Sequence, residues 1–435
     1  MIPNIIPRPS HIISRAHISE NALTVLRRLR RAGFQAYLVG GGVRDLLLGR
    51  EPKDFDVATD ASPEQVRQVF YNCRLIGRRF RLAHVHFGQD IVEVATFRGS
   101  GTETEEETGD RCLKNGRIIR DNIYGTLEED ALRRDFTVNA LYYNIEDFSV
   151  VDFAGGMADL QAGRLRLIGD PDQRYREDPV RMLRAVRFAA KLGFQLSPEC
   201  EAPLSRMSHL LHEVPAARLF EEILKLMLYG TAVEAFEKLR HYGLFAHLFP
   251  VTEEALTHEE GQFPLLLVAR GLANTDQRTL QGKPVTPAFL FAILLWEPVR
   301  RRMLALEDQG HPPQAAVHEA ADQVLISQQR LVGIPKRFSL PMREIWALQE
   351  RFESRTGKRP FRFVEHPRFR AAFDFMMLRA EVGEVEADVA AWWRDFQKAD
   401  EAGRLALLTP HKQRAHRRRR RRGGARGRAA TQTID

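Results

Sequence analysis

Two aspartates one residue apart, Asp54 and Asp56, are the residues whose types and spacing best suit chemistry. We expect them on a strand, where side chains at i and i+2 share a face. Phe55 and Val57 then face the core. Two hard oxygen ligands about 6–7 Å apart along a strand can hold a pair of Mg²⁺ ions. Such a pair clamps the attacking and leaving oxygens of a phosphoryl transfer, so Asp54 and Asp56 are predicted to be catalytic metal ligands.

A run of three glycines, 40–42, precedes these aspartates. The apolar run 37–39 predicts a buried strand before the glycines, and residues 43–48 predict a short helix after them. Without a Cβ, the backbone at Gly41 can approach a phosphate closely, and the start of the helix offers unpaired N–H groups. Arg44, in the first turn, adds a forked donor for a triphosphate. The elements around the aspartates therefore predict a phosphate cradle next to the metal site.

Two other interpretations of this stretch compete with this one. A glycine turn between a strand and a helix also opens dinucleotide-binding units, but those need one acid roughly 20 residues further on. Here the acids come earlier and are doubled. An isolated Asp-x-Asp is often only a solvated strand edge or loop. The glycine turn and the paired acids in this order favour the phosphate-and-metal interpretation.

Composition limits the class of protein. The chain has 435 residues, which suggests about three domains, and its hydrophobic content of 44% is typical of a globular protein. Three scattered cysteines suit a reducing cytosol, and we expect a cytoplasmic protein without a membrane span. Residues 411–435 carry a formal charge of +9, which leaves −1 for residues 1–410. This tail predicts phosphate binding and suits single-stranded RNA, with an acidic membrane surface as the competitor.

Residues 37–59 resemble the class II nucleotidyltransferases, the family of bacterial poly(A) polymerases and CCA-adding enzymes. The resemblance continues through 75–87, 126–143 and 175–194. The matching residues are Leu38-Val39-Gly40-Gly41-Gly42-Val43-Arg44-Asp45, Leu47-Leu48-Gly49, Asp54-Phe55-Asp56, Arg133-Arg134-Asp135-Phe136-Thr137 and Asn139. It implies transfer of AMP from ATP to an RNA 3′-hydroxyl, repeated without a template.

The resemblance also implies further site residues. Asp135 would be the third active carboxylate, although it could instead cap the following helix, and Glu93 is its rival as third ligand. Arg134 would contact the nucleotide. On the helix predicted over 175–194, Asp178 and Arg181 would read the edge of the base, and Arg184 would contact the nucleotide as well. Asp178 before Pro179 could also serve as the cap of that helix.

The expected fold class is α+β: a small mixed-sheet nucleotidyltransferase head followed by all-helical neck and body domains. The predicted divisions are an N-terminal extension (1–19), the catalytic head (20–160), a helical neck that binds nucleotide and RNA (161–255), a helical body with a C-terminal RNA-binding region (256–408), and a disordered Arg-rich tail (409–435). The alternation of Arg and Phe over 361–375 predicts a packed helix face, with an RNA-facing surface as the alternative.

The sequence thus predicts a poly(A) polymerase that acts in RNA processing and turnover. Two Mg²⁺ ions are its expected cofactors, ATP its substrate, and RNA 3′ ends and RNA-decay proteins its partners. The segment 78–81 (Arg-Arg-Phe-Arg) and the basic tail favour this over a CCA-adding tRNA nucleotidyltransferase. The intact carboxylates favour it over a non-catalytic RNA-binding protein of the same fold.

Overall fold

The structure is a computed structural model that describes residues 2–77, 81–99, 111–114, 117–121, 123–257 and 263–408. Two segments used in the sequence predictions lie outside the described residues: 78–80 and the tail 409–435. The chain forms two compact units. The first comprises Met1–Thr257, Leu272–Val285 and Leu325–Ile334, and the second comprises His258–Gly271, Thr286–Val324 and Pro335–Asp435.

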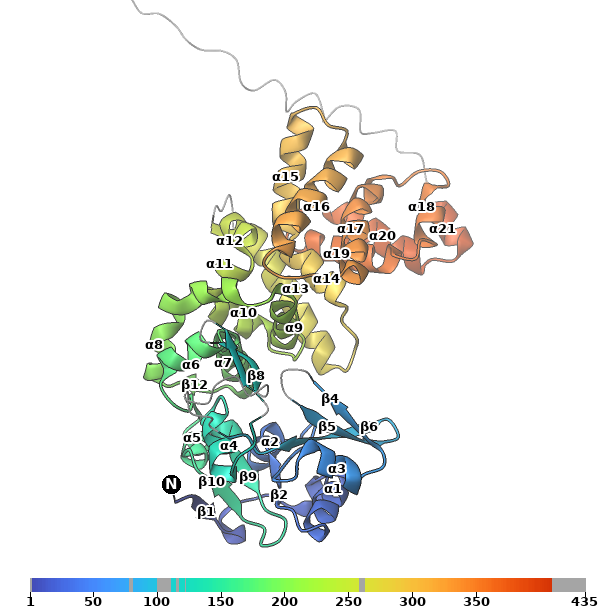
Figure 1. The fold of residues 1–435 in the computed structure, drawn as a ribbon. Coiled ribbons are helices and arrows are strands. Elements are labelled where there is room, and N and C mark those ends of the chain that lie inside the picture. Colours follow the sequence, from blue (N-terminus) through green and yellow to red (C-terminus); the bar gives the residue numbers. More distant parts are fainter. Residues whose placement is uncertain are drawn as a thin grey trace, which may run out of the picture. The chain divides into compact units, whose positions relative to one another are not determined.

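A mixed sheet of eight strands forms the base of the first unit (Figure 1). Strands β3 and β6 run parallel, and the other neighbours are antiparallel. The order across the sheet is β1 (Asn4–Ile6), β10 (Val150–Asp152), β9 (Leu141–Tyr143), β2 (Ala36–Val39), β3 (Asp56–Thr59), β6 (Asp90–Thr96), β5 (Leu82–Phe87) and β4 (Cys73–Ile76). This arrangement confirms the predicted mixed-sheet head.

Two short pairs stand apart from this sheet. They are β7 (Arg111–Lys114) with β8 (Arg117–Asp121), and β11 (Arg164–Leu165) with β12 (Gln195–Leu196).

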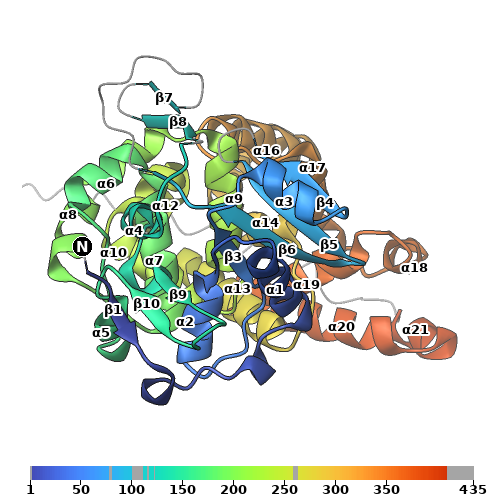
Figure 2. The ribbon, with the colours of Figure 1, turned by 60° about the horizontal axis from the view of Figure 1, so that its bottom comes forward.

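Helices α1 (Glu20–Arg31) and α3 (Pro63–Val69) pack side by side against the sheet (Figure 2). Ser19 caps α1 by accepting a hydrogen bond from the N–H of Ala22. Ser62 and Gln65 form a capping box that starts α3 at Pro63.

Side chains of β3 alternate between the two faces of the sheet, so Asp56 shares a face with Ala58. Ala58 belongs to a buried apolar cluster with residues of β2, β9 and α4.

The remaining α-helices of the first unit lie between the strands of the sheet or after them in the chain. They are α2 (Gly41–Leu47), α4 (Leu127–Arg133), α5 (Gly156–Gln161), α6 (Pro171–Glu177), α7 (Val180–Leu192), α8 (Pro198–Met207), α9 (Ala216–Met227), α10 (Ala232–His241), α11 (Leu244–Leu248) and α12 (Pro250–Thr257). Helix α13 (Phe263–Leu280) belongs partly to each unit. The first unit therefore holds both the segment predicted as head and the segment predicted as neck.

The segment 175–194 differs from the single helix predicted there. It is divided between α6, which ends at Glu177, and α7, which begins at Val180. Pro179 cannot donate a backbone hydrogen bond, and the residue before a proline avoids the helical conformation, so the chain breaks at Asp178. Helix α7 ends before Gly193, where the positive φ of 71° suits glycine.

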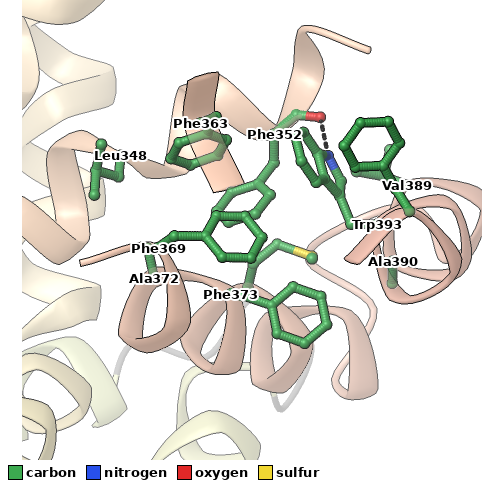
Figure 3. Packing of buried hydrophobic residues seen from close by; sticks show 11 residues of the cluster. Leu348, Phe352, Phe363, Phe369, Ala372, Phe373, Val389, Ala390 and Trp393 are labelled. Atoms are coloured by element: carbon green, nitrogen blue, oxygen red, sulfur yellow. Dashed lines mark hydrogen bonds between the residues drawn. The ribbon is translucent and has the colours of Figure 1, made fainter. Parts of the chain in front are cut away.

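The second unit is helical. It contains α14 (Pro287–Leu294), α15 (Trp296–Asp308), most of α16 (Pro313–Gln329), α17 (Lys336–Ala347), α18 (Arg359–Val364), α19 (Phe369–Glu381), α20 (Ala387–Lys398) and α21 (Glu401–Leu407). Figure 3 shows its aromatic core, where the Nε1 of Trp393 donates to the carbonyl of Phe352 at 2.8 Å. Phe363, Phe369 and Phe373 are buried in this core, so the arginine–phenylalanine alternation belongs to a packed face.

None of the described helices combines the length and the apolar content that crossing a membrane requires.

Candidate active site

The turn between β2 and α2 brings the sheet face and a helix start together. Gly40 has a φ of 75° and ends β2, while Gly41 and Gly42 already belong to α2. A side chain at Gly40 would place its Cβ 3.7 Å from both the Oδ2 of Asp56 and the Nη1 of Arg134. Glycine is therefore required at residue 40 for its backbone conformation, and the turn lies directly beside two of the predicted site residues.

Strand β3 begins at Asp56, so Asp54 lies two residues before it and not on the strand as predicted. The acids Asp54, Asp56 and Glu93 are nevertheless close enough to influence one another. Asp56 pairs in register with Glu93 of the parallel strand β6. Burial, with the negative charges of Glu93 and Asp54, raises the pKa of Asp56 to about 6 against the opposing effect of Arg134.

Asp56 lines a cavity of about 250 Å³ whose walls come from the sheet and from helices α4, α6 and α7. The charged residues of its lining are four acids and five arginines: Asp56, Glu93, Asp130, Asp178, Arg98, Arg133, Arg134, Arg174 and Arg181. Carboxylates suit metal ions, and the guanidinium groups suit phosphate oxygens. A larger cavity of about 980 Å³ lies around the start of α8, but its lining contains none of the residues predicted for the site.

Arg134 is held rigidly at the edge of this cavity. Its Nε donates to the hydroxyl of Tyr142 at 2.8 Å, and its Nη2 donates to the Oδ2 of Asp130 at 3.0 Å. Burial alone would lower the pKa of Arg134, but Tyr142 and Asp130 outweigh burial and raise it. The guanidinium therefore stays charged, with Nη1 directed to the turn at Gly40.

The predicted residue Asp135 lies behind the cavity and not in its lining. Its carboxylate accepts hydrogen bonds from Arg184, from Asn139 at 3.2 Å and from the backbone N–H of Phe136 at 2.8 Å. Burial would raise the pKa of Asp135, but Arg184 above all holds it well below its usual range. The bond to its neighbour does not make Asp135 a helix cap, because Phe136 occupies the cap position of the following 3-10 helix.

Arg44 is buried, with only 2% of its surface exposed, and does not line the cavity. Its guanidinium donates to the carboxylate of Asp45 and to the side-chain oxygen of Asn139 at 2.6 Å. Arg44 also lies beside the glycine turn, since a Cβ at Gly41 would stand 3.5 Å from its Nη2, and its contact with a triphosphate stays a prediction. Arg44, Asn139, Asp135 and Arg184 form a hydrogen-bonded chain that links α2 to α7.

The predicted base-reading residues have partners of their own. Asp178 accepts two hydrogen bonds of 2.7 Å from Arg218 of α9, so its side chain does not cap α7. Arg181 donates to Glu177 at 3.0 Å and to the backbone carbonyl of Arg174 at 2.7 Å. Both residues still line the cavity.

Sequence reasoning missed Arg98, Arg174 and Arg218. Arg174 donates to the carbonyls of Arg133 and Arg134 at 2.7 and 2.5 Å, so it ties α6 to the end of α4. The start signal for α6, Asp170 followed by Pro171, could have predicted a helix that carries Arg174. No local signal marks Arg218, because it meets Asp178 forty residues away in the chain.

The fold is similar to that of solved tRNA-processing enzymes. One of them, a tRNA-processing enzyme without substrate, matches with a TM-score of 0.59 and 24% identity over 92% of this chain and 100% of that chain. Residues 36–166 match the family described as the poly A polymerase head domain. Fold and site therefore define a nucleotidyltransferase, an enzyme class that generally uses divalent metal ions and nucleoside triphosphates.

Two further family descriptions match later segments. Residues 193–256 match the "probable RNA and SrmB-binding site of polymerase A", and residues 309–426 match the "polymerase A arginine-rich C-terminus". Poly(A) polymerase I of Salmonella typhi is 53% identical over 90% of this chain and 85% of that protein. The chain belongs to the bacterial poly(A) polymerase I family, within the class II nucleotidyltransferases.

CCA-adding enzymes are more distant relatives. The CCA-adding enzyme of Bacillus pumilus is 36% identical over 57% of this chain and 60% of that protein. The resemblance found in the sequence is thus confirmed, as is the prediction of a poly(A) polymerase over the CCA-adding and non-catalytic alternatives. RNA and ATP are the substrates that this membership implies.

Proposed function

We propose that the cavity at Asp56 is where the chain transfers AMP from ATP to the 3′-hydroxyl of RNA, with release of pyrophosphate and without a template. The observation that carries this proposal is the meeting of two carboxylates of the sheet, Asp56 and Glu93, with five arginines in one small cavity. A nucleoside triphosphate brings negative phosphates and bound cations, and this lining offers a partner to each. The cytoplasm, where RNA is processed and turned over, is the proposed location.

The donor set fits divalent metal ions. Asp54 and Asp56 would hold two Mg²⁺ ions, because Mg²⁺ prefers carboxylate oxygens and binds with a few protein ligands together with substrate phosphates. Burial, together with the negative charges of Glu93 and Asp54, raises the pKa of Asp56, and a bound cation would stabilise its ionised form. Among the described residues no group of three or more His, Cys, Asp or Glu could hold a metal ion by itself, so phosphates and water would complete the shell. When bound, the ions would acidify the 3′-hydroxyl and neutralise the departing pyrophosphate.

Glu93 is a better candidate than Asp135 for the third carboxylate of the site. Glu93 lines the cavity beside Asp56 and has His84 as a neighbour at 3.3 Å, whereas Asp135 is outside the lining and is bound by Arg184 and Asn139. A carboxylate with a strongly lowered pKa is also a poor general base near neutral pH. We therefore assign Asp135 and Arg184 a positioning role, in which they fix α7 relative to the segment that carries Arg134.

The phosphates of ATP would lie between the turn at Gly41 and the arginines of the cavity. Arg134 faces that turn and keeps its charge, so it would bind an oxygen of the triphosphate directly. Arg44 would support the same turn from behind through Asp45 and Asn139.

Asp178 and Arg181 would recognise the base, since an acceptor and a donor on adjacent turns can match the edge of adenine. Arg218 holds Asp178 through two hydrogen bonds, so the acceptor has a fixed orientation before the nucleotide arrives. Fixed orientation favours one base over another because a wrong edge does not match the acceptor and the donor that these residues present.

The Arg-rich tail would raise the local affinity for RNA, and RNA-decay proteins remain proposed partners.

One experiment tests the function as a whole. Each labelled nucleoside triphosphate is offered separately to the full chain, with a generic RNA and with a tRNA that lacks its terminal CCA. Long homopolymeric A on the generic RNA is the expected result. Incorporation of CTP that stops after three nucleotides on the tRNA would contradict the proposal.

A further inference from the structure

A tyrosine and two lysines from three separate elements meet beside the proposed metal ligands. Tyr229 follows the end of α9 and keeps 38% of its surface exposed. The Nζ of Lys53 lies 4.8 Å from the centre of the Tyr229 ring, and the Nζ of Lys191 of α7 lies 5.5 Å from it. Lysine ammonium groups are drawn to aromatic faces at such distances. The three side chains therefore form one cationic and aromatic cluster in the first unit.

The surroundings of this cluster carry an excess of positive charge. Asp45 lies 3.9 Å from Lys191, but its other oxygen is already bound by Arg44 at 2.7 Å. Arg187 is close to Tyr229 and pairs with Glu222 at 2.8 Å. Lys53 is exposed, contacts the ring of Tyr229, and is close enough to Lys191 to repel its charge. With Lys225, which lies 3.7 Å from Glu222, five cations accompany these two carboxylates, which favours binding of an anion.

The place of the cluster in the fold connects it with the transfer reaction. Lys53 directly precedes Asp54, so its backbone is fixed one residue from a proposed metal ligand. Lys191 stands on α7, the helix that also carries Arg181 at the cavity. Neither lysine nor Tyr229 lines the cavity assigned to ATP. The cluster therefore lies beside Asp54 and outside the nucleotide cavity. The proposed transfer reaction assigns no role to its three residues.

We propose that Lys53, Lys191 and Tyr229 form the binding site for the 3′ end of the acceptor RNA strand. The lysines would hold a backbone phosphate, and the tyrosine ring would stack on a base. Aromatic rings combined with positive charges are the general means of binding single-stranded RNA without sequence preference, because every base has a face to stack. The inference rests on the proposed function, since it assigns the second substrate of that reaction.

The test uses full-length variants and measures RNA and ATP separately. Affinity for a short oligoadenylate is measured by fluorescence anisotropy with EDTA and without ATP, and KM values are measured for RNA and for ATP. Tyr229→Ala should weaken RNA binding about tenfold, as expected for the loss of one stacked base, while Tyr229→Phe should retain it. Lys53→Ala should lower the salt dependence of binding by about 0.7 in the slope of log K against log salt, while Lys53→Arg should retain the slope.

Arg31→Ala provides a charge-matched control. Arg31 is exposed at the end of α1, and its substitution by alanine removes one positive charge, as Lys53→Ala does. It should leave the RNA affinity unchanged. A rise in KM for ATP with an unchanged RNA affinity would overturn the inference and assign the lysines to the triphosphate. Unchanged KM values in Tyr229→Ala and Lys53→Ala would overturn it as well. If the unaltered chain incorporates no AMP yet these variants still lose RNA affinity, the proposed function fails and the RNA site stands.

Discussion

The carboxylate of Asp178 lies against the guanidinium of Arg218 in a two-pronged ion pair, with both hydrogen bonds at 2.7 Å. Arg218 belongs to α9, whereas Asp178 separates α6 from α7. A residue with no place in the nucleotide cavity thus sets the orientation of one that lines it. Arg218 is in this sense a positioning residue for base recognition.

Arg218→Ala should therefore reduce the preference for ATP over CTP. Loss of the pair leaves Asp178 free to turn, and the ratio of kcat/KM for ATP to that for CTP should fall about tenfold, the equivalent of one charged hydrogen bond. Steady-state incorporation of each nucleotide on the same RNA measures the ratio. Arg218→Lys keeps the charge but not the two-pronged geometry and should give an intermediate ratio. An unchanged ratio in Arg218→Ala would remove Arg218 from base selection.

The pair of Asp135 and Arg184 should contribute to stability. Arg184→Ala leaves the carboxylate of Asp135 without its charged donor, and the free energy of unfolding should fall by about 2 kcal/mol near neutral pH. Because the pair lowers the folded-state pKa of Asp135, its contribution is present above the ordinary aspartate pKa of about 4 and is lost as the pH falls through the lower folded value.

Denaturant unfolding of Arg184→Ala at neutral and at acidic pH checks this prediction. The difference from the unaltered chain should shrink toward low pH. Asp135→Asn combined with Arg184→Ala should recover part of the loss, since an amide costs less to leave without a charged partner. Equal destabilisation at every pH would show that packing, not charge, explains the effect.

Removal of residues 411–435 should weaken RNA binding, and most strongly at low salt. The segment carries ten Lys or Arg and one acid, and attraction to phosphates decreases as salt is added. Binding isotherms over a range of salt concentrations measure the effect. The truncated chain should show a shallower salt dependence than the full chain. Identical isotherms would exclude the tail from RNA binding.

Sequence patterns predicted the fold well where the signal is local. The glycine run 40–42 marks the turn from a strand to a helix, because a positive φ value depends on a few neighbouring residues. Strand β2 and helix α2 could also be predicted from the apolar run and the glycines. The position of Asp54 was less well predicted, because the strand starts two residues later.

The contacts of the site residues could not be predicted in this way. Arg44 is predicted to donate to phosphates from the first turn of a helix, yet its guanidinium is buried and donates to Asn139, ninety-five residues further along the chain. Asp178 could serve as a helix cap, yet its carboxylate accepts hydrogen bonds from Arg218 of another helix. Glu93 was predicted only as one of two candidates for the third carboxylate, and the register of two parallel strands, which one sequence does not reveal, places it beside Asp56. Such partners are set by tertiary packing and not by spacing along the chain.

The central claim is that Asp54 and Asp56 hold the metal ions for nucleotidyl transfer. The most direct measurement is the rate of AMP incorporation by full-length Asp54→Asn, with RNA affinity measured in parallel. Asp54 is exposed and precedes its strand, so the substitution should leave the fold intact. We expect the rate to fall about a thousandfold, as several kcal/mol of metal-ion stabilisation are lost, while RNA affinity stays unchanged. A variant that extends RNA at the rate of the unaltered chain would contradict the metal-site assignment.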